Sequence, residues 1–218
     1  MALKLANVPV APGRERNAFR LIQGLAEGPR TELDFIGRRY LLALSRMAVA
    51  QHLSGKELGI KLWEAPTPEV AGKRACFVTI SASGNLRGCI GSLKAERPLV
   101  YDVIENALRA AFYDERFPPL SSAELKRVKF SISVLDEPAA LRAETPAGLL
   151  AGLEPGKHGL IIRKGGCIAT YLPYVWRIFP GREDFLKNLC IKAGLDGNEW
   201  KEPGLMEFHT YEAQEFSE

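Results

Sequence analysis

Long hydrophobic runs are missing from this sequence. Its most apolar stretch, residues 41–50, is interrupted by Arg46, whereas a membrane-spanning helix needs about 20 predominantly apolar residues. Residues 1–13 contain prolines and lack the apolar segment of a secretory signal peptide. The sequence therefore predicts a chain that does not span a membrane and stays in the cytoplasm with its thiols reduced.

Closely spaced metal-ligand and nucleophile motifs are missing as well. The four cysteines form no C-x-x-C pair, because they lie far apart at Cys76, Cys89, Cys167 and Cys190. This spacing argues against a zinc ribbon, a thioredoxin-type redox motif and an iron–sulfur cluster bound by one loop. The chain also has no Ser-centred nucleophile elbow, Walker loop or zinc-protease helix. We therefore predict no metal site and no cofactor.

Neither sign of charge dominates the chain. The 29 Lys and Arg residues nearly balance the 26 Asp and Glu residues, for a net charge of +3. Acidic and basic residues are interleaved, as in residues 114–116 and 182–184, and no basic stripe stands out. Binding of RNA or DNA is therefore the weakest of the functions considered. It would require a basic face assembled in space from dispersed residues such as Arg87, Arg116 and Lys129.

The composition is that of a globular protein. Of the 218 residues, 46% are hydrophobic and 25% are charged, which is enough apolar material to fold without disulfides or metal. This balance excludes a disordered, collagen-like, coiled-coil or disulfide-scaffold protein. The length fits one large domain or two small ones that share a core.

Helical and strand patterns alternate along the chain. A short helix is expected at residues 15–27, and a stronger one begins after Thr31, as its N-cap, and ends at Gly55. The apolar stripe of the second helix is expected at Leu33, Ile36, Tyr40, Leu44 and Met47. The central part predicts a hairpin of strands 75–81 and 86–91, a helix from Pro98 to Tyr113, and an alternating strand at 128–134.

The last third repeats these ingredients. It predicts a hairpin of strands 160–163 and 167–172, a helix at 182–193 and a final strand at 205–211. Two units of hairpin plus helix suggest an internal duplication, although the residues do not repeat. Because helices and mostly antiparallel strands are interspersed without a long βαβ series, we predict an α+β fold.

Arg87 and Cys89 belong to the most unusual short segment, residues 86–91. Residues two apart on a strand share a face, so these two side chains are expected to point together. A guanidinium beside a thiol favours the reactive thiolate, and Gly88 and Gly91 would let a ligand approach the sulfur. The structural alternative is a buried small hydrophobic residue on a strand that needs glycine for packing or a bulge.

A cysteine nucleophile usually needs a base, and the chain has three histidines. His158 lies in a glycine-containing loop before a strand, where catalytic groups are often mounted. His52, near a helix end, and His209, on the final strand, are expected to be structural. We therefore take His158 as the candidate base for Cys89.

Two further segments supply candidate site residues. In the loop at 114–119, Glu115 is a candidate for acid–base work and Arg116 for substrate binding, or their charges stay paired at a rigid proline corner. Tyr171 and Tyr174 are candidate aromatic walls of a substrate pocket, although packing in the core is the simpler explanation.

Five segments together resemble the AMMECR domain family, whose members are also called AmmeMemoRadiSam system protein A. In chain order they are LRGCIG at Leu86–Gly91, DERFPPL at Asp114–Leu120, ISVL at Ile132–Leu135, GKHGL at Gly156–Leu160 and YLPYV at Tyr171–Val175. The likeness runs from about Leu33 to Phe216. Tyr174 departs from the family pattern, in which many members have glutamine.

The resemblance implies an α+β fold with a larger and a smaller subdomain and a cleft between them. Residues 1–30 then form an N-terminal arm with a short helix, and residues 31–216 form the family domain. In microbes the gene often lies with those for a Memo-like protein and a radical S-adenosylmethionine protein, which are the implied partners. Any iron–sulfur chemistry would belong to the latter, because this chain lacks the three-cysteine motif.

The family brings no settled reaction and no catalytic residue list. The leading hypothesis is an enzyme-like component that acts with these partners on a small molecule or modified residue in the cleft. Cys89 is then the reactive thiol, Arg87 its electrostatic partner and His158 a possible base. The alternative is a protein-binding or scaffold module without turnover, which recognises its partner through the cleft or an exposed edge strand.

Overall fold

The computed structural model describes residues 32–56, 59 and 65–218. The expected N-terminal arm and the helix at 15–27 lie outside these residues. Among the residues described, no helix is long and apolar enough to cross a bilayer.

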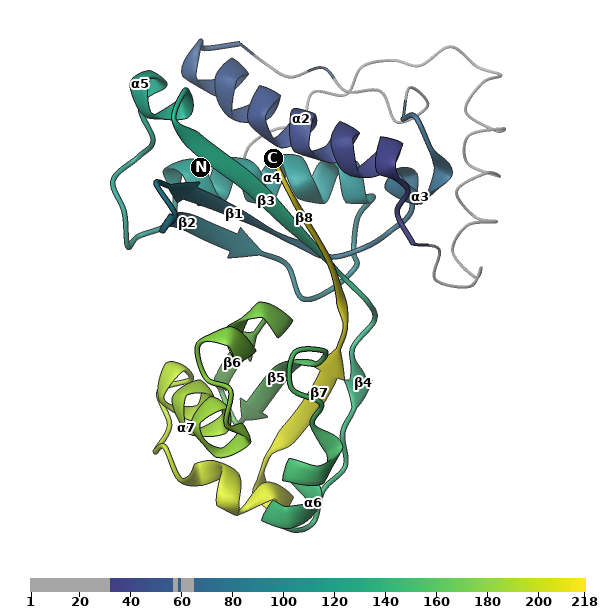
Figure 1. The fold of residues 1–218 in the computed structure, drawn as a ribbon, viewed down its shortest axis with the longest axis vertical. Helices are drawn as coiled ribbons and strands as arrows, with labels where there is room; N and C mark the ends of the chain where they lie inside the picture. Colours follow the sequence, from purple (N-terminus) through teal and green to yellow (C-terminus); the bar gives the residue numbers. More distant parts are fainter. Residues whose placement is uncertain (1–31, 57–58, 60–64) are drawn as a thin grey trace.

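The chain folds into two lobes, each built on a four-stranded antiparallel sheet (Figure 1). The large lobe comprises the described residues up to 136 together with 213–218, and the small lobe comprises residues 137–212. The large sheet has the strand order β2-β1-β3-β8, where the strands are β1 (Cys76–Ala82), β2 (Asn85–Gly91), β3 (Val128–Leu135) and β8 (Ala213–Ser217). The α+β class is therefore confirmed.

Two helices of the large lobe, α2 (Phe35–Leu53) and α4 (Leu99–Phe112), pack against each other and against the sheet (Figure 1). The short helices α3 (Pro68–Ala71) and α5 (Ser122–Leu125) flank them. Ser121 and Glu124 form a capping box at the start of α5.

The start and the buried face of α2 differ from the prediction. Asp34 is the N-cap, and its side chain accepts a hydrogen bond from the Gly37 N–H at 2.7 Å. The buried Leu33 precedes the helix, so it does not set the helical phase. Ile36 and Met47, expected inside, are therefore 58% and 41% exposed, whereas Leu41, Leu44, Ala48 and Val49 are buried.

The predicted first hairpin is confirmed as β1 and β2. Ser83 and Gly84 turn the chain with φ angles of 50° and 82°, as a tight two-residue hairpin requires. The pairing register shifts from Ile80 opposite Gly88 to Ser81 opposite Leu86, so Arg87 is the extra residue of a β-bulge. This bulge breaks the alternation on which the shared face of Arg87 and Cys89 was predicted.

The small sheet has the strand order β4-β7-β5-β6. Its strands are β4 (Ala139–Ala140), β5 (Gly159–Lys164), β6 (Cys167–Tyr171) and β7 (Glu207–Tyr211). The helices of this lobe are α6 (Pro146–Gly152) and α7 (Arg182–Lys192), with the single 3-10 turns η2 (Pro173–Arg177), η3 (Glu199–Lys201) and η4 (Pro203–Leu205). The second predicted hairpin is confirmed as β5 and β6.

The expected end of the chain is wrong in one respect. The chain does not close with a strand at 205–211, because β8 follows β7 after Glu212 and returns to the large sheet beside β3. The small lobe is thus inserted between two strands of the large one, and the chain crosses the junction twice. The Asp136 N–H donates to the Glu212 carbonyl at 2.9 Å and ties the two crossings together.

Each lobe has its own hydrophobic core, and a third cluster joins them. This bridging cluster consists of buried side chains from both lobes, namely Ala75, Leu135, Ile161, Leu172 and Tyr211. The lobes are therefore held by apolar packing as well as by the two crossings.

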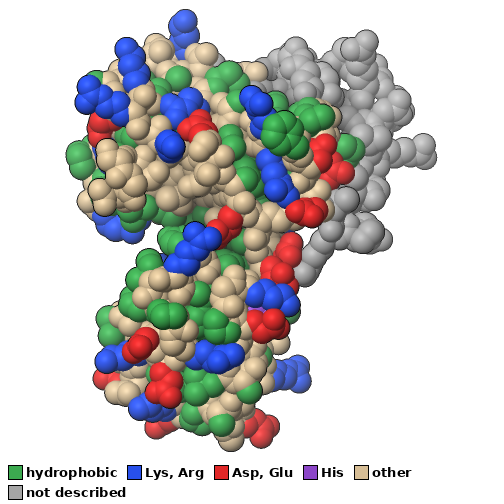
Figure 2. Space-filling view, viewed as in Figure 1, with side chains coloured by type: hydrophobic (Ala, Val, Ile, Leu, Met, Phe, Trp, Pro, Cys, Tyr) green, Lys and Arg blue, Asp and Glu red, His purple; other side chains and the backbone are tan. Residues whose placement is uncertain are grey.

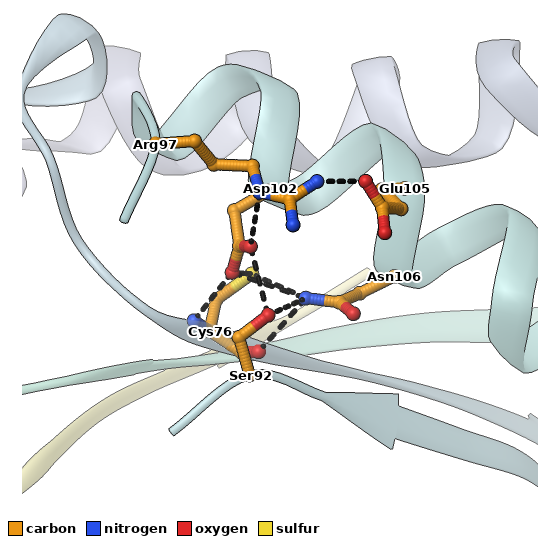
Figure 3. A network of polar contacts seen from close by, with 6 residues as sticks. All are labelled: Cys76, Ser92, Arg97, Asp102, Glu105 and Asn106. Atoms are coloured by element: carbon orange, nitrogen blue, oxygen red, sulfur yellow. Dashed lines mark hydrogen bonds and ion pairs between the residues drawn. The ribbon is translucent and has the colours of Figure 1, made fainter. Parts of the chain in front are cut away.

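A buried polar network fixes α4 to the large sheet (Figure 3). The Asp102 carboxylate accepts hydrogen bonds from the Cys76 N–H at 3.0 Å and from the Ser92 hydroxyl at 2.8 Å. The Asn106 amide reaches the Cys76 carbonyl at 3.1 Å. Because buried polar groups lose stability when a partner is removed, this network holds the start of β1 and the end of β2 in place beneath α4.

Candidate functional site

Cys89 lies on β2, the edge strand of the large sheet. Its side chain is half-buried, and its sulfur lies 3.1 Å from the Thr79 hydroxyl on the paired strand. Its backbone is bound by the loop that follows α4. The Cys89 N–H donates to the Asp114 carboxylate at 2.8 Å, and the Cys89 carbonyl accepts from the Arg116 guanidinium at 3.2 Å. This part of the sheet edge is thereby closed to a further strand.

Asp114 and Arg116 form a tight ion pair beside the thiol. Two guanidinium nitrogens of Arg116 donate to Asp114 at 2.8 and 2.7 Å. The Asp114 side chain is only 4% exposed. Its hydrogen bonds, mainly those from Arg116, lower the pKa of this carboxyl to about 2, so Asp114 is ionised at neutral pH.

The small lobe brings a second cation to the same place. Lys192, the last residue of α7, donates to the Thr170 carbonyl on β6 at 2.9 Å and lies 5.0 Å from the centre of the Tyr171 ring. Its positive charge lowers the pKa of the Cys89 thiol, as does that of Arg116. Cations from both lobes therefore act on one sulfur atom.

The ammonium of Lys192 has no acidic partner. Within the described part of the chain, no carboxylate lies within ion-pair distance of it. Burial by the surrounding protein lowers its pKa, and the Arg116 charge acts in the same direction, although the residue remains exposed to solvent.

Tyr174 connects this cluster to a groove of about 340 Å³. The groove is lined by residues of both lobes, six from the small lobe and two from β8 of the large lobe: Gly156, Lys157, Pro173, Tyr174, Arg177, Glu212, Ala213 and Glu215. Burial raises the pKa of the Tyr174 phenol, and so does the Cys89 thiolate when it forms. In Figure 2 acidic and basic side chains meet at the narrow waist between the lobes.

The acidic thiol expected from the sequence is wrong for this fold. Burial raises the pKa of Cys89 and outweighs the Thr79 hydrogen bond and the two cations that lower it. The thiol is therefore protonated at neutral pH. Arg116 and Lys192 make its pKa less high than burial alone would make it.

Arg87 is not the cation beside Cys89. Its guanidinium donates to the Glu124 carboxylate and to the Pro118 carbonyl, both at 2.8 Å, and lies 5.8 Å from the Phe117 ring centre. Arg87 therefore anchors the loop after α4 to α5. At this bulge Arg87 has no partner residue on β1, whereas its neighbours Leu86 and Gly88 are paired with Ser81 and Ile80.

His158 and Glu115 lie apart from this cluster. His158 accepts a hydrogen bond from the Glu154 N–H through Nδ1 at 3.2 Å, and its carbonyl accepts one from the Trp176 indole at 2.7 Å. These bonds fix the loop before β5. Glu115 is exposed on its turn, while its neighbour Asp114 is the carboxylate that faces Cys89. The structure thus offers no contact that makes His158 the base of Cys89.

Gly88 and Gly91 are required by packing. A Cβ at Gly88 would lie 2.2 Å from the Ala110 carbonyl oxygen on α4, and one at Gly91 would lie 2.2 Å from the Phe77 ring. The backbone that approaches Gly88 is therefore that of α4 rather than that of a ligand. This is the structural alternative raised for both glycines.

The sequence candidates that do gather here are Cys89, Arg116, Tyr171 and Tyr174. The residues missed are Lys192 and Asp114. Asp114 stands beside the chosen Glu115, and only burial separates the two carboxylates. Lys192 resembles any basic residue at a helix end, so no signal in the sequence marks it.

Among the described residues, no group of three His, Cys, Asp or Glu side chains could hold a metal ion.

Arg87 and Arg116 do not supply the free positive charge that a nucleic-acid-binding face would require. Arg87 is buried against Glu124, and Arg116 is paired with Asp114. Each charge is therefore offset by a neighbouring carboxylate, which argues against a polyanion-binding surface at these residues.

Comparisons with known proteins identify relatives over most of the chain. The AMMECR1 family model matches residues 42–216. Protein MK0488 of Methanopyrus kandleri is 37% identical over 188 residues, which cover 82% of this chain and 87% of the relative. Protein NEQ441 of Nanoarchaeum equitans is 37% identical over 181 residues, which cover 82% of this chain and 98% of the relative.

A solved structure shares the fold. The crystal structure of the uncharacterized protein PH0010 from Pyrococcus horikoshii matches with a TM-score of 0.79 and 31% sequence identity. The match covers 87% of this chain and 94% of that chain.

Proposed function

This chain belongs to the AMMECR1 family, and we propose that it is an enzyme-like component whose cleft between the lobes holds a small molecule or modified residue beside Cys89. The proposal rests on one observation. Cys89 is the cysteine on which cations from both lobes act, through Arg116 and Lys192. A ligand in contact with the sulfur would therefore lie in the electric field of cations from both lobes.

The other cysteines are less suited to such a role. Cys76 and Cys190 are buried in the cores of their lobes. The Cys76 thiol lies 3.3 Å from the Asp102 carboxylate, and burial raises its pKa well above the ordinary value. Cys167 is half-buried at the start of β6, beside the turn of its hairpin. Reactive cysteines are partly exposed and lie near positive charge, and Cys89 meets both conditions.

The residues around Cys89 would have separate tasks. Cys89 reacts as a thiolate, with its proton released to solvent, because no histidine contacts it in the described structure. Its sulfur would form a bond to an electrophilic atom of the ligand, and the electron pair of the bond that breaks at this atom would leave with the displaced group. Arg116 and Lys192 stabilise the thiolate once it forms. Tyr171 and Tyr174 provide aromatic walls. Since burial keeps the pKa high, thiol-dependent reactions are expected to accelerate as the pH rises.

We further propose that the chain acts with a Memo-like protein and a radical S-adenosylmethionine protein. This chain would supply the cleft, and the radical partner would supply any iron–sulfur chemistry. Co-purification of both partners with the wild-type chain from its own host is the expected result. Failure to recover either one from a host that produces all three would contradict this part of the proposal.

The rate of thiol labelling against pH tests the role of Cys89. Iodoacetamide should modify Cys89 in the folded protein, with a rate that rises through a pKa above the ordinary cysteine value. The C89S variant should lose this reaction and the matched C167S variant should keep it. R87Q should leave the pKa of Cys89 unchanged, since Arg87 faces Glu124.

Two results would decide against thiol chemistry. If Cys89 in the folded protein stays unmodified even at alkaline pH, the thiol is closed to reagents and to substrates. If the host carrying C89S behaves as wild type while a deletion does not, the chain serves as a binding or scaffold module instead.

A further inference from the structure

The groove of about 340 Å³ has one wall on the large lobe, formed by β8. On this strand Gln214 accepts a hydrogen bond from the Leu33 N–H at 2.8 Å, and Phe216 packs against the core of the large lobe. Because side chains alternate along a strand, Ala213 and Glu215 point to the other face of the sheet, where Ala213 packs against the bridging cluster. Both residues line the groove.

The small lobe supplies the other wall through η2. Residues three apart lie on the same side of a 3-10 helix, so Tyr174 and Arg177 share a side of this turn, and both line the groove. Trp176 is buried and donates its indole N–H to the His158 carbonyl at 2.7 Å. This bond ties the loop that carries Lys157, a further lining residue, to η2.

Two cationic and two anionic side chains line the groove, so their charges balance. Lys157 and Glu212 approach each other to 3.5 Å and compensate one another. Arg177 and Glu215 carry the other two charges, and neither has an oppositely charged partner within ion-pair distance among the described residues. Burial raises the pKa of the Glu215 carboxyl, and the Arg177 charge lowers it by less. The groove thus offers one positive and one negative group that are not paired with each other.

We infer that the groove binds a small zwitterion that carries an ammonium and a carboxylate, namely an amino acid or a short peptide. The ligand's ammonium contacts Glu215 and its carboxylate contacts Arg177. A ligand with charge of one sign only is attracted by one of these groups and repelled by the other. The groove volume of about 340 Å³ lies within the range of roughly 300–1,000 Å³ that is typical of small-molecule sites.

The rest of the lining suits an apolar ligand side chain. The Tyr174 ring, Pro173 and Ala213 provide carbon surface between the two charged groups. An aromatic amino acid therefore fits this lining better than a polar one. Since Glu215 belongs to the large lobe and Arg177 to the small one, the bound zwitterion contacts both lobes.

This inference goes beyond the proposed function, because Cys89 does not line the groove and binding requires no reaction at the thiol. C89S should therefore bind the zwitterion like the wild type. Loss of binding in C89S would place the ligand at the sulfur and contradict the groove site. A Cys89 that resists labelling would refute the thiol role and leave the groove site standing.

Calorimetric titration of the intact protein at neutral pH tests the inference. The zwitterionic probes are L-phenylalanine and the dipeptide glycyl-L-phenylalanine. N-acetyl-L-phenylalanine lacks the ammonium, and 2-phenylethylamine lacks the carboxylate. At least one zwitterion should bind about tenfold or more tightly than both single-charge analogues. Tighter binding of L-phenylalanine identifies an amino-acid site, and tighter binding of the dipeptide identifies a peptide site.

Two variants separate the contributions of the two charges. E215Q should weaken binding of the zwitterion about tenfold or more and leave N-acetyl-L-phenylalanine unaffected. R177Q should weaken the zwitterion equally and leave 2-phenylethylamine unaffected. R163Q and E207Q remove exposed charges of the small lobe that do not line the groove, and both should bind like the wild type. If neither zwitterion binds to the wild type, or if E215Q and R177Q bind it unchanged, the site is refuted.

Discussion

At the scale of the residue, burial decides which charges matter. Asp114 and Glu115 are adjacent carboxylates, yet only Asp114 is buried, where it binds the Cys89 N–H and the Arg116 guanidinium. Burial likewise raises the pKa of Cys89 above the level that its two neighbouring cations would set. The sequence therefore suggests Arg87 where the structure has Arg116 as the cation at Cys89, and it suggests Glu115 where the structure has Asp114 as the carboxylate.

Asp114 should make stability depend on pH in the acid range. Its pKa of about 2 in the folded protein lies below the value of about 3.9 in an unfolded chain. The carboxylate thus stabilises the fold by about 2 kcal/mol above pH ~4, and this contribution is lost as the pH falls through about 2. Urea unfolding should give D114N a free energy of unfolding about 2 kcal/mol below that of the wild type at neutral pH. This difference should shrink as the pH is lowered.

The neighbouring carboxylate is the control for this measurement. E115Q removes an exposed charge on the same turn and should change the free energy of unfolding by less than about 0.5 kcal/mol. An equal loss in E115Q and D114N, or a D114N difference that persists unchanged in acid, would contradict the assignment.

At the scale of the element, the sequence predicts the strands and helices better than their faces. Both hairpins, α4 and α7 follow from turn residues and apolar spacing. Strand β8 was missed because its residues carry no alternation strong enough to separate it from the end of the chain. The sequence did not predict the bulge at Arg87. A bulge depends on the register between two paired strands, and the residue pattern of one strand alone does not specify that register.

The site was predicted less well than the elements for the same reason. Cys89, Arg116 and the two tyrosines stand out by residue type within unusual segments. Lys192 reaches the Thr170 carbonyl only through the packing of α7 on β6. No local pattern contains that contact.

Gly88 and Gly91 offer a prediction about β2. In G88A the new methyl group meets the backbone carbonyl of Ala110, which cannot move without displacing α4. We expect the free energy of unfolding to fall by about 3 kcal/mol or more, which is at the upper end for an overpacked core. In G91A the methyl group meets the Phe77 side chain, which can rotate, and about 1–2 kcal/mol is expected. Urea unfolding measures both, and a G91A variant less stable than G88A would contradict this packing.

At the scale of the whole molecule, both lobes bring a cation to the junction by the same route. In the large lobe the loop after α4 carries Arg116 to the Cys89 carbonyl on the edge strand β2. In the small lobe the end of α7 carries Lys192 to the Thr170 carbonyl on the edge strand β6. Each lobe has a hairpin, a helix and a third strand beside the first. The suggested duplication would explain this repeated placement.

The bridging cluster should make the two lobes unfold together. Leu135 is 3% exposed and packs with Ile161, Leu172 and Tyr211 across the junction. The buried Cys76 and Cys190 report on the large and the small lobe respectively. Labelling of these thiols in increasing urea should therefore give one midpoint for the wild-type protein.

Removing the bridge should separate the lobes. L135A is expected to lower the free energy of unfolding by about 2–5 kcal/mol. It should also give Cys76 and Cys190 separate labelling midpoints in urea, because the two chain crossings alone couple the lobes less strongly than the packed cluster does. V175A changes the small-lobe core away from the bridge. It should lower the free energy of unfolding and separate the labelling midpoints of Cys76 and Cys190 less than L135A does. Separate midpoints already present in the wild type would show that the lobes are independent.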